Sequence, residues 1–458
     1  SESSNVIDST DAVSTLGLTA QDTTTYNDDT QGLTYTLDPD AKTATVCAYS
    51  GTAKVIVIPG SVTVNSTEYT VVDFGTVFKG TAIEQITIPK SVTALSANAF
   101  SACKSLTKAT FEDGFNVEIS SACFKTCTAL TEVDNVCLGT VIKNPNYAPF
   151  NGCSKLATVT ISSATASIGN YNFYQNNAIT SIDIPSSVTT VNKYAFYKCA
   201  GLVTVTGCTG LETVANYAFN GCTALANFNF DAVKTIGTYA FQNCAFASVT
   251  LKNTDEIAES AFFGCANLKS LEVDKGAIDF QAFASLGISS LKLGNGVTSI
   301  GSGAFCYNSL EGTLDIPGTV TTLGGAAFSN NTSLTNVTIE DGVSSIDHAC
   351  FQGCTALKTI SIPDSVTSIG DNKTSGMVFN KCTNLSEIQL GSASHYTWAN
   401  NKLISNETGD TLFDLAVSDG VELSSVGEDK TIESFTVEAN VISITHHAYG
   451  AFCNLTNL

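Results

Sequence analysis

The stretch IPSSVTTVNKYAFYKCAGL, from Ile184 to Leu202, contains the phrase that decides the fold. An isoleucine and a proline open it, β-branched residues follow, and Ala195-Phe196 comes shortly before Cys199. The opening Ile-Pro-x-Ser/Thr-Val-Thr accounts for five of the eight prolines in the chain, with copies that begin at Ile58, Ile88, Ile184, Ile316 and Ile362. A phrase that recurs in this way indicates a repeat protein rather than a set of separate globular domains.

The phenylalanine of the phrase recurs at steps of 21 to 28 residues, mostly 22 or 23. Its copies are Phe78, Phe100, Phe124, Phe150, Phe173, Phe196, Phe219, Phe241, Phe262, Phe283, Phe305, Phe328, Phe351 and Phe379, and a fifteenth lies at Phe452. Ahead of many copies stands Leu-x-x-Val/Ile-x-Ile/Leu, as at Leu156, Val159 and Ile161. After its first residue this pattern has the period of two that is typical of a strand.

Each repeat is therefore predicted to contain a strand, a turn, a second short strand such as 188–191, and one helical or 3-10 turn around Ala-Phe. About 22 residues cannot bury an apolar face alone, whereas stacked repeats form a continuous core. We expect a solenoid of about 14 coils, in which Phe196, Phe219 and Phe241 form a ladder of like side chains.

The repeats resemble the BspA-type, or treponemal-type, leucine-rich repeat, on the pattern Ile-Pro-x-Ser-Val-Thr-x-Ile-Gly-x-x-Ala-Phe-x-x-Cys-x-x-Leu. The resemblance covers about residues 31–458, and it implies a right-handed leucine-rich repeat coil. Members of the family are mostly secreted or surface proteins, and several act in adhesion or coaggregation. The resemblance therefore implies a protein-binding surface on the strand face, and no catalysis.

The two ends of the chain depart from the repeat. Residues 1–30 are rich in Ser, Thr and Asp and are expected to form a flexible acidic tail. Residues 31–75 predict a β-hairpin cap that covers the first coil. The solenoid is expected over 76–390, a hairpin insertion over 391–432, and final repeats over 433–458 that are either truncated or without a final cap.

Charge excludes some classes of partner. The chain has 42 acidic residues against 21 basic ones, all of them lysine, for a net charge of -21. A nucleic-acid-binding protein needs a basic stripe, usually with arginine. An anionic membrane or an acidic substrate is also disfavoured by this balance, and no run of 18 apolar residues predicts a membrane span. The acidity is most simply interpreted as a source of solubility.

Most cysteines occupy one fixed place in the repeat. Nine of the 16 cysteines stand three residues after a repeat phenylalanine, among them Cys199, Cys222 and Cys244, and asparagine takes that place at Asn176, Asn308 and Asn331. A position that accepts either residue predicts a small buried group that bonds to the backbone, with mostly free thiols. Disulfides between neighbouring coils are the alternative, because stacked coils bring Cα atoms close enough. No pair with metal-site spacing is present.

Catalytic signatures are missing from the sequence. No Gly-x-Ser-x-Gly elbow, His-Glu-x-x-His motif, phosphate loop or dinucleotide fingerprint occurs. The four histidines are His348, His395, His446 and His447, and the adjacent pair is expected to be a surface pair without a chemical role. We predict that the protein is not an enzyme and needs no cofactor or metal.

Aromatic residues give the candidate ligand-binding positions. Tyr171, Tyr194, Tyr217 and Tyr239 each stand two residues before a repeat phenylalanine in four successive repeats. Stacked coils would align them into a tyrosine stripe, which either binds a ligand or merely covers the turn. Tyr396 and Trp398, the only tryptophan, precede the predicted hairpin and act either as a binding anchor or as a buried plug.

The sequence thus predicts a secreted or cell-surface solenoid that binds a host or neighbouring-cell surface protein through an extended face. The alternative is a glycan-binding surface protein that uses the tyrosine stripe. The location expected for either is extracellular.

Overall fold

The structure is a computed structural model, and it describes residues 6–8, 24–139, 142–370 and 377–414. The chain divides into two units, Ser1–Phe246 and Ala247–Leu458, which we call unit 1 and unit 2. Both are β-solenoids, and the chain makes about 14 turns with almost no helix. Most of the predicted acidic tail and all of the predicted final repeats lie outside the described residues.

Unit 1 starts with a sheet in the order β1-β2-β3-β4-β7-β6. Its strands are β1 Val6–Asp8, β2 Thr24–Asp28, β3 Leu33–Asp38, β4 Thr43–Tyr49, β6 Ser61–Val64 and β7 Thr67–Asp73. Strands β3 and β4 pair antiparallel around a turn in which a carboxylate oxygen of Asp38 accepts from the backbone N–H groups of Asp40 and Ala41. Strands β4 and β7 pair in parallel.

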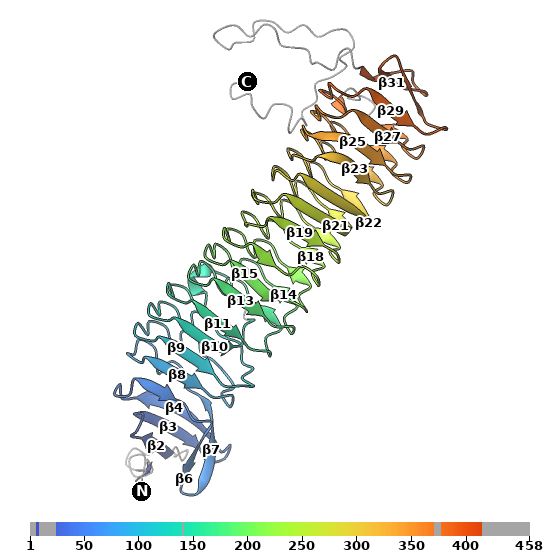
Figure 1. Cartoon of the computed structure of the whole chain (residues 1–458). Coiled ribbons are helices and arrows are strands. Elements are labelled where there is room, and N and C mark those ends of the chain that lie inside the picture. Colours follow the sequence, from blue (N-terminus) through green and yellow to red (C-terminus); the bar gives the residue numbers. More distant parts are fainter. Residues whose placement is uncertain (1–5, 9–23, 140–141, 371–376, 415–458) are drawn as a thin grey trace, which may run out of the picture. The chain divides into compact units, whose positions relative to one another are not determined.

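The coils of unit 1 then stack their strands in parallel (Figure 1). The long strands are β5 Val55–Val57, β8 Gln85–Ile88, β9 Lys108–Phe111, β10 Glu132–Val136, β11 Thr158–Ile161, β13 Ser181–Ile184, β15 Thr204–Gly207 and β17 Asn227–Phe228. The short strands are β12 Ser167–Ile168, β14 Thr190–Val191, β16 Thr213–Val214 and β18 Thr235–Ile236. Residues Pro145–Tyr147 form a 3-10 turn.

Unit 2 repeats this plan. Two of its strands, β21 Ser270–Ile278 and β22 Ser290–Ile300, run through the positions of both the long and the short strand. The other strands are β19 Ser248–Leu251, β20 Glu256–Ile257, β23 Gly312–Ile316, β24 Thr322–Leu323, β25 Leu334–Ile339, β26 Ser345–Ile346, β27 Thr359–Ile362, β28 Ser368–Ile369 and β29 Glu387–Leu390. An antiparallel sheet of β30 Tyr396–Ala399, β31 Lys402–Ser405 and β32 Thr411–Asp414 follows.

Phenylalanine rings form the spine of both cores. The rings of Phe196 and Phe219 lie 4.9 Å apart and are parallel to within 5°, and Phe219 and Phe241 are 5.4 Å apart. In unit 2 the rings of Phe305 and Phe328 repeat the contact at 5.4 Å. These rings are fully buried, so each removes a large apolar area from water and adds a stacking contact. The repeat recurs so often because each phenylalanine ring packs between the rings of the coils on either side.

In most coils consecutive β-turns take the place of the predicted helical or 3-10 turn around Ala-Phe, whereas 3-10 residues precede Phe150 and Phe379. In the coil of Phe196 the N–H groups of Ala195, Tyr197 and Cys199 bond to carbonyls three residues earlier. The alternate N–H groups of Phe196 and Lys198 instead bond to Ala218 and Asn220 of the next coil. Tyr194 and Lys198 have φ of 60° and 57°, and these left-handed residues interrupt any helix.

In most coils the side chain three residues after the phenylalanine bonds to the coil before it. The Cys222 thiol donates to the Phe196 carbonyl at 3.1 Å, and the Asn308 amide donates to the Phe283 carbonyl at 2.8 Å. The same bond joins Cys103, Cys127, Cys153, Cys199, Cys244, Cys354 and Cys382 to the phenylalanine one coil earlier. All 15 cysteines of the described part are free thiols, and Cys47 is the exposed one.

Candidate functional site

The outward side chains of the long strands in unit 1 form the first candidate surface, which we call the strand face. It consists of Gln85, Thr87, Lys108, Thr110, Glu132, Asp134, Thr158, Thr160, Ser181, Asp183, Thr204 and Thr206. The alternate residues of these strands, such as Ile86 and Val133, are buried in the core. Parallel pairing aligns the outward side chains in rows, for example Gln85, Lys108 and Glu132. The strand face is therefore a polar surface on a rigid support.

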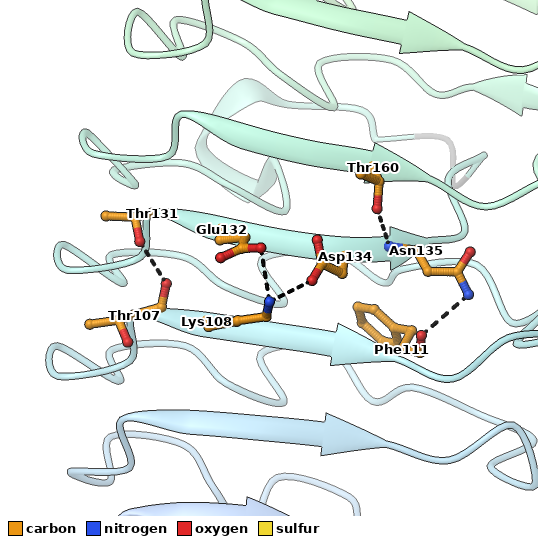
Figure 2. Close-up of polar contacts among 8 residues, drawn as sticks. All are labelled: Thr107, Lys108, Phe111, Thr131, Glu132, Asp134, Asn135 and Thr160. Atoms are coloured by element: carbon orange, nitrogen blue, oxygen red, sulfur yellow. Dashed lines mark hydrogen bonds and ion pairs between the residues drawn. The ribbon is translucent and has the colours of Figure 1, made fainter.

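One lysine organises the centre of the strand face (Figure 2). The Lys108 ammonium lies 2.8 Å from a carboxylate oxygen of Glu132 and 2.8 Å from one of Asp134. Asp134 first, and then Glu132, raise the pKa of Lys108, so it keeps its charge at any physiological pH. In the neighbouring coils the Thr206 hydroxyl donates to Asp183 at 2.7 Å. These five side chains of the strand face thus hold one another in position before any partner binds.

A β-bulge interrupts strand β10 close to this lysine. Asn135 has a φ of 57°, and the pairing of β10 with β11 shifts between Val133 and Val136. The Asn135 N–H donates to the Thr160 hydroxyl at 2.7 Å, and its amide donates to the Phe111 carbonyl at 3.2 Å (Figure 2). Asparagine tolerates this backbone conformation and satisfies the groups that the bulge leaves unpaired.

The predicted tyrosine stripe lies on the turns of four successive coils. The ring centroids of Tyr171 and Tyr194 are 5.1 Å apart, those of Tyr194 and Tyr217 are 5.0 Å apart, and those of Tyr217 and Tyr239 are 5.3 Å apart. The planes of neighbouring rings differ by 1° to 24°. All four side chains are half-buried. The stripe therefore shows its ring edges to solvent, while neighbouring rings largely cover the faces of Tyr194 and Tyr217.

The sequence reasoning missed a second tyrosine column. Tyr174 and Tyr197 stand one residue after their repeat phenylalanines, and their rings are 5.3 Å apart. Each makes an edge contact to the first column, Tyr174 to Tyr171 and Tyr197 to Tyr194, both at 5.6 Å. Burial raises the pKa of Tyr194, and neighbouring tyrosines add to the shift. The signal in the sequence was the repeated Phe-Tyr pair.

The backbone under the stripe does not require tyrosine. Tyr171, Tyr194, Tyr217 and Tyr239 have φ values between 54° and 60°, a region that bulky residues adopt at a cost. Gly303 and Ala326 occupy the same place in two coils of unit 2, with φ of 62° and 57°. Because a smaller residue serves the fold at this place, the tyrosines are present for what their side chains contact.

Lysines accompany the tyrosines on the turns. We call the segments 74–83, 96–106, 120–130, 146–156, 169–179, 192–202, 215–225 and 237–246 the turn face of unit 1. They contain no Asp or Glu and six lysines, which are Lys79, Lys104, Lys125, Lys155, Lys193 and Lys198. Lys125 and Lys198 lie over the rings of Tyr147 and Tyr197, at 5.6 and 5.3 Å. The turn face is thus a basic and aromatic surface within an acidic protein.

Tyr396 and Trp398 lie together on β30, away from the stripe in sequence and in another unit. Tyr396 is buried, with 7% of its surface exposed, and burial raises its pKa. Trp398 is half-buried, and its ring stacks on Phe413 of β32 at 6.2 Å. The tryptophan therefore packs its own small sheet and shows only part of its ring, while Tyr396 offers little surface to a ligand.

Groups that could carry out chemistry are not gathered into one place. Burial raises the pKa of the Cys354 thiol to about 12, which leaves it protonated and unreactive near neutral pH. His348 contacts Asp347 at 3.0 Å, and His395 contacts Glu407 at 3.3 Å. Within the described ranges, no three His, Cys, Asp or Glu side chains are grouped closely enough to hold a metal ion. His446 and His447 lie outside the described residues.

The comparison with family models decides the classification. The model for the BspA type leucine rich repeat region matches in 6 copies, over residues 75–203, 194–311 and 312–408. The chain belongs to the BspA-type leucine-rich repeat family. The prediction from the repeat phrases is thereby confirmed. No curated protein matches the chain.

Solved structures that are similar to this BspA-type chain are other leucine-rich repeat proteins. One from Bacteroides ovatus is 22% identical, covers 74% of this chain and 98% of its own, and has a TM-score of 0.47. A leucine rich cell surface protein from Faecalibacterium prausnitzii is 24% identical, covers 80% and 94%, and has a TM-score of 0.30. The pneumococcal vaccine antigen PcpA is 18% identical, covers 80% and 98%, and has a TM-score of 0.34. In the part of this chain that the structure describes, no helix is long and apolar enough to cross a membrane.

Proposed function

We propose that this BspA-type protein is a non-catalytic adhesin, secreted or held at a cell surface, and that its strand face binds a protein of a host or of a neighbouring cell. The observation that carries the proposal is the register of polar side chains on the stacked strands, with Lys108 fixed between Glu132 and Asp134. A prearranged polar surface lowers the entropic cost of association. Membership of the repeat family supports a binding role, because such solenoids present extended surfaces to partners.

The test compares the strand face with the turns. The full chain would be screened against matrix and cell-surface proteins by surface plasmon resonance. For each partner found, Thr158→Arg with Ser181→Arg should lower affinity about tenfold or more, because two bulky charges enter the contact. The matched control, Thr128→Arg with Thr223→Arg, places the same charges on exposed turn residues and should change little. Equal losses in both variants, or no bound protein at all, would contradict the proposal.

The second candidate is glycan binding by the tyrosine stripe, and one observation favours it. Tyrosine fills a left-handed position in four successive coils, although glycine or alanine serves the fold elsewhere. Substitution of Tyr194 and Tyr217 by alanine should then remove a carbohydrate-array signal. The stacked arrangement offers ring edges and hydroxyl groups, so hydrogen bonding would contribute more than the packing of a sugar against a ring face.

A further inference from the structure

The geometry points to the turn face of unit 1 as a binding site for an anionic polysaccharide, one that carries sulfate or carboxylate groups. This inference names the ligand class for the glycan candidate and rests on that candidate, not on protein binding by the strand face. Charge is the first observation that supports this ligand class. The protein has a net charge of -21, yet the turn face has six lysines and no carboxylate. An overall charge balance, which disfavours acidic ligands, hides this local excess of positive charge.

Some lysines outside the turn face are neutralised by carboxylates, whereas those on the turn face are not. Lys108, Lys234, Lys275 and Lys292 each form an ion pair with a carboxylate of a neighbouring coil. In the described part of the chain, the turn-face lysines take part in no ion pair. Five of them are exposed, and Lys125 is half-buried. Lys125 and Lys198 lie over tyrosine rings, and the other ammonium groups of the turn face are available to an anionic ligand without the loss of an ion pair.

The lysines follow the direction in which the coils stack. Coils that begin the turn face contribute Lys79, Lys104, Lys125 and Lys155 in turn, and the coil of Phe196 contributes two more. Backbone bonds keep adjacent turns in register, as between Ala102 N–H and the Lys125 carbonyl at 2.8 Å. Stacked strands advance by about 4.8 Å per coil. Positive charges therefore recur in most coils from Phe78 to Phe196, at different places in the repeat, which suits a linear polymer that carries many anionic groups.

The groups between the lysines suit a hydroxyl-rich polymer better than a protein. Lys193 and Lys198 flank Tyr194 and Tyr197 in one coil, so ammonium and phenol groups lie close together. In unit 1 the well-exposed large apolar side chains of the described residues are Val55, Val57, Tyr147 and Val203, and only Tyr147 belongs to the turn face. Protein interfaces are usually enriched in aromatic and apolar groups at their centre, and the turn face offers only Tyr147 as a well-exposed group of this kind. A polysaccharide needs charge and hydrogen bonds, and the surface supplies both.

The same geometry disfavours nucleic acid. Bases stack on exposed aromatic faces, but each ring inside the stripe is covered by a neighbour at about 5 Å. The chain also contains no arginine, which is the usual partner of phosphate in a fixed geometry.

The experiment uses the full chain and three polymers: heparin for sulfate, polygalacturonate for carboxylate, and neutral dextran. Binding would be measured by isothermal titration calorimetry at low and at high salt. We expect heparin or polygalacturonate to bind at low salt and dextran not to bind, with the affinity reduced strongly by 0.5 M NaCl because ionic contacts are screened (about 4 Å Debye length). Preference for one anionic polymer identifies the charged group.

Variants locate the site. The quadruple variant Lys104→Gln, Lys155→Gln, Lys193→Gln, Lys198→Gln should lower the affinity about tenfold or more, since four ammonium groups are removed. The matched control Lys42→Gln, Lys90→Gln, Lys269→Gln, Lys358→Gln changes net charge equally at exposed lysines outside the turn face, and it should lower affinity less than about twofold. Thr158→Arg with Ser181→Arg should leave polysaccharide binding unchanged, which separates this inference from strand-face binding.

Three outcomes would overturn the inference. The first is that neither anionic polymer binds at low salt. The second is that the two quadruple variants lose affinity equally, which would show attraction to lysines in general. The third is that polyglutamate binds as tightly as the better polysaccharide and loses affinity in the same variant, which would assign the turn face to an acidic protein instead.

Discussion

The turns of unit 1 and unit 2 share one backbone but present opposite chemistry. In unit 2 the equivalent segments are 258–268, 279–288, 301–310, 324–334, 347–357 and 377–385. They contain the acids Glu259, Asp279 and Asp347 and a single lysine, Lys381. The left-handed place that holds tyrosine in four coils of unit 1 holds Ser260, Gln281, Gly303, Ala326 and Ala349 in unit 2.

This difference separates what the fold needs from what it merely permits. Most coils of both units share the stacked phenylalanine, a small donor three residues later and a left-handed residue two before. Neither unit needs a particular side chain on the outside of the turn. We therefore propose that a charge or ring concentrated in one unit serves binding rather than stability.

The largest expected effect is alkaline unfolding of both units together. Burial raises the pKa of Cys222 in unit 1 and that of Cys354 in unit 2, the latter from 9.0 to about 12. The unfolded chain therefore releases thiol protons at a lower pH than the folded chain. The free energy of unfolding should stay constant below about pH 8 and fall between about pH 9 and 12, by about 1.4 kcal/mol per pH unit for each buried thiol.

Urea unfolding followed by circular dichroism at several pH values measures this fall. Cys354→Ser should reduce the slope of the free energy of unfolding against pH by the contribution of one thiol. Thiol titration in denaturant without reductant should find all 16 cysteines reactive, whereas in the native protein only Cys47 should react among the 15 described cysteines. A flat profile together with few reactive thiols would mean that neighbouring coils are linked by disulfides.

The repeat phrase was sufficient to predict the coil, because its apolar spacing allows only one way to bury each ring. Phe196 and Phe219 needed no further information to be placed together. The helical turn was predicted wrongly because Tyr-Ala-Phe contains no glycine to reveal left-handed backbone, yet Tyr194 adopts it. The turn face was not foreseen, since lysines such as Lys104 and Lys155 stand at different places in the repeat and only stacking gathers them.

A smaller effect is expected when the asparagine that some coils have three residues after the phenylalanine is changed to cysteine. The resulting change in the free energy of unfolding should differ in sign between the units. In unit 2 the side-chain oxygen of Asn308 accepts from the N–H groups of Leu286 and Ile288, at 3.2 and 3.0 Å. In unit 1 the oxygen of Asn176 is buried without a hydrogen-bond partner. Asn308→Cys should therefore cost about 2 kcal/mol, because two buried donors lose their acceptor.

Asn176→Cys is the matched variant, because the thiol keeps a donor for the Phe150 carbonyl and removes the unpaired oxygen. It should leave the free energy of unfolding unchanged or raise it by up to about 1 kcal/mol. Urea denaturation of the two variants beside the wild type gives the comparison. The same loss in both would show that the ladder position demands asparagine for a reason other than its oxygen.

The smallest expected effect on stability is that of Tyr217→Asn, at the centre of the stripe. The change removes stacking contacts with Tyr194 and Tyr239, which are worth about 0.5–1.5 kcal/mol each. It also relieves the cost of left-handed backbone at a bulky residue, about 1–2 kcal/mol, because asparagine adopts this conformation readily. These terms offset each other, so the free energy of unfolding should change by less than about 1 kcal/mol. Heparin affinity should nevertheless fall if the stripe binds ligand, and Ala326→Tyr in unit 2 should not increase it. A large loss of stability with unchanged binding would instead show that the tyrosines serve only to cover the turn.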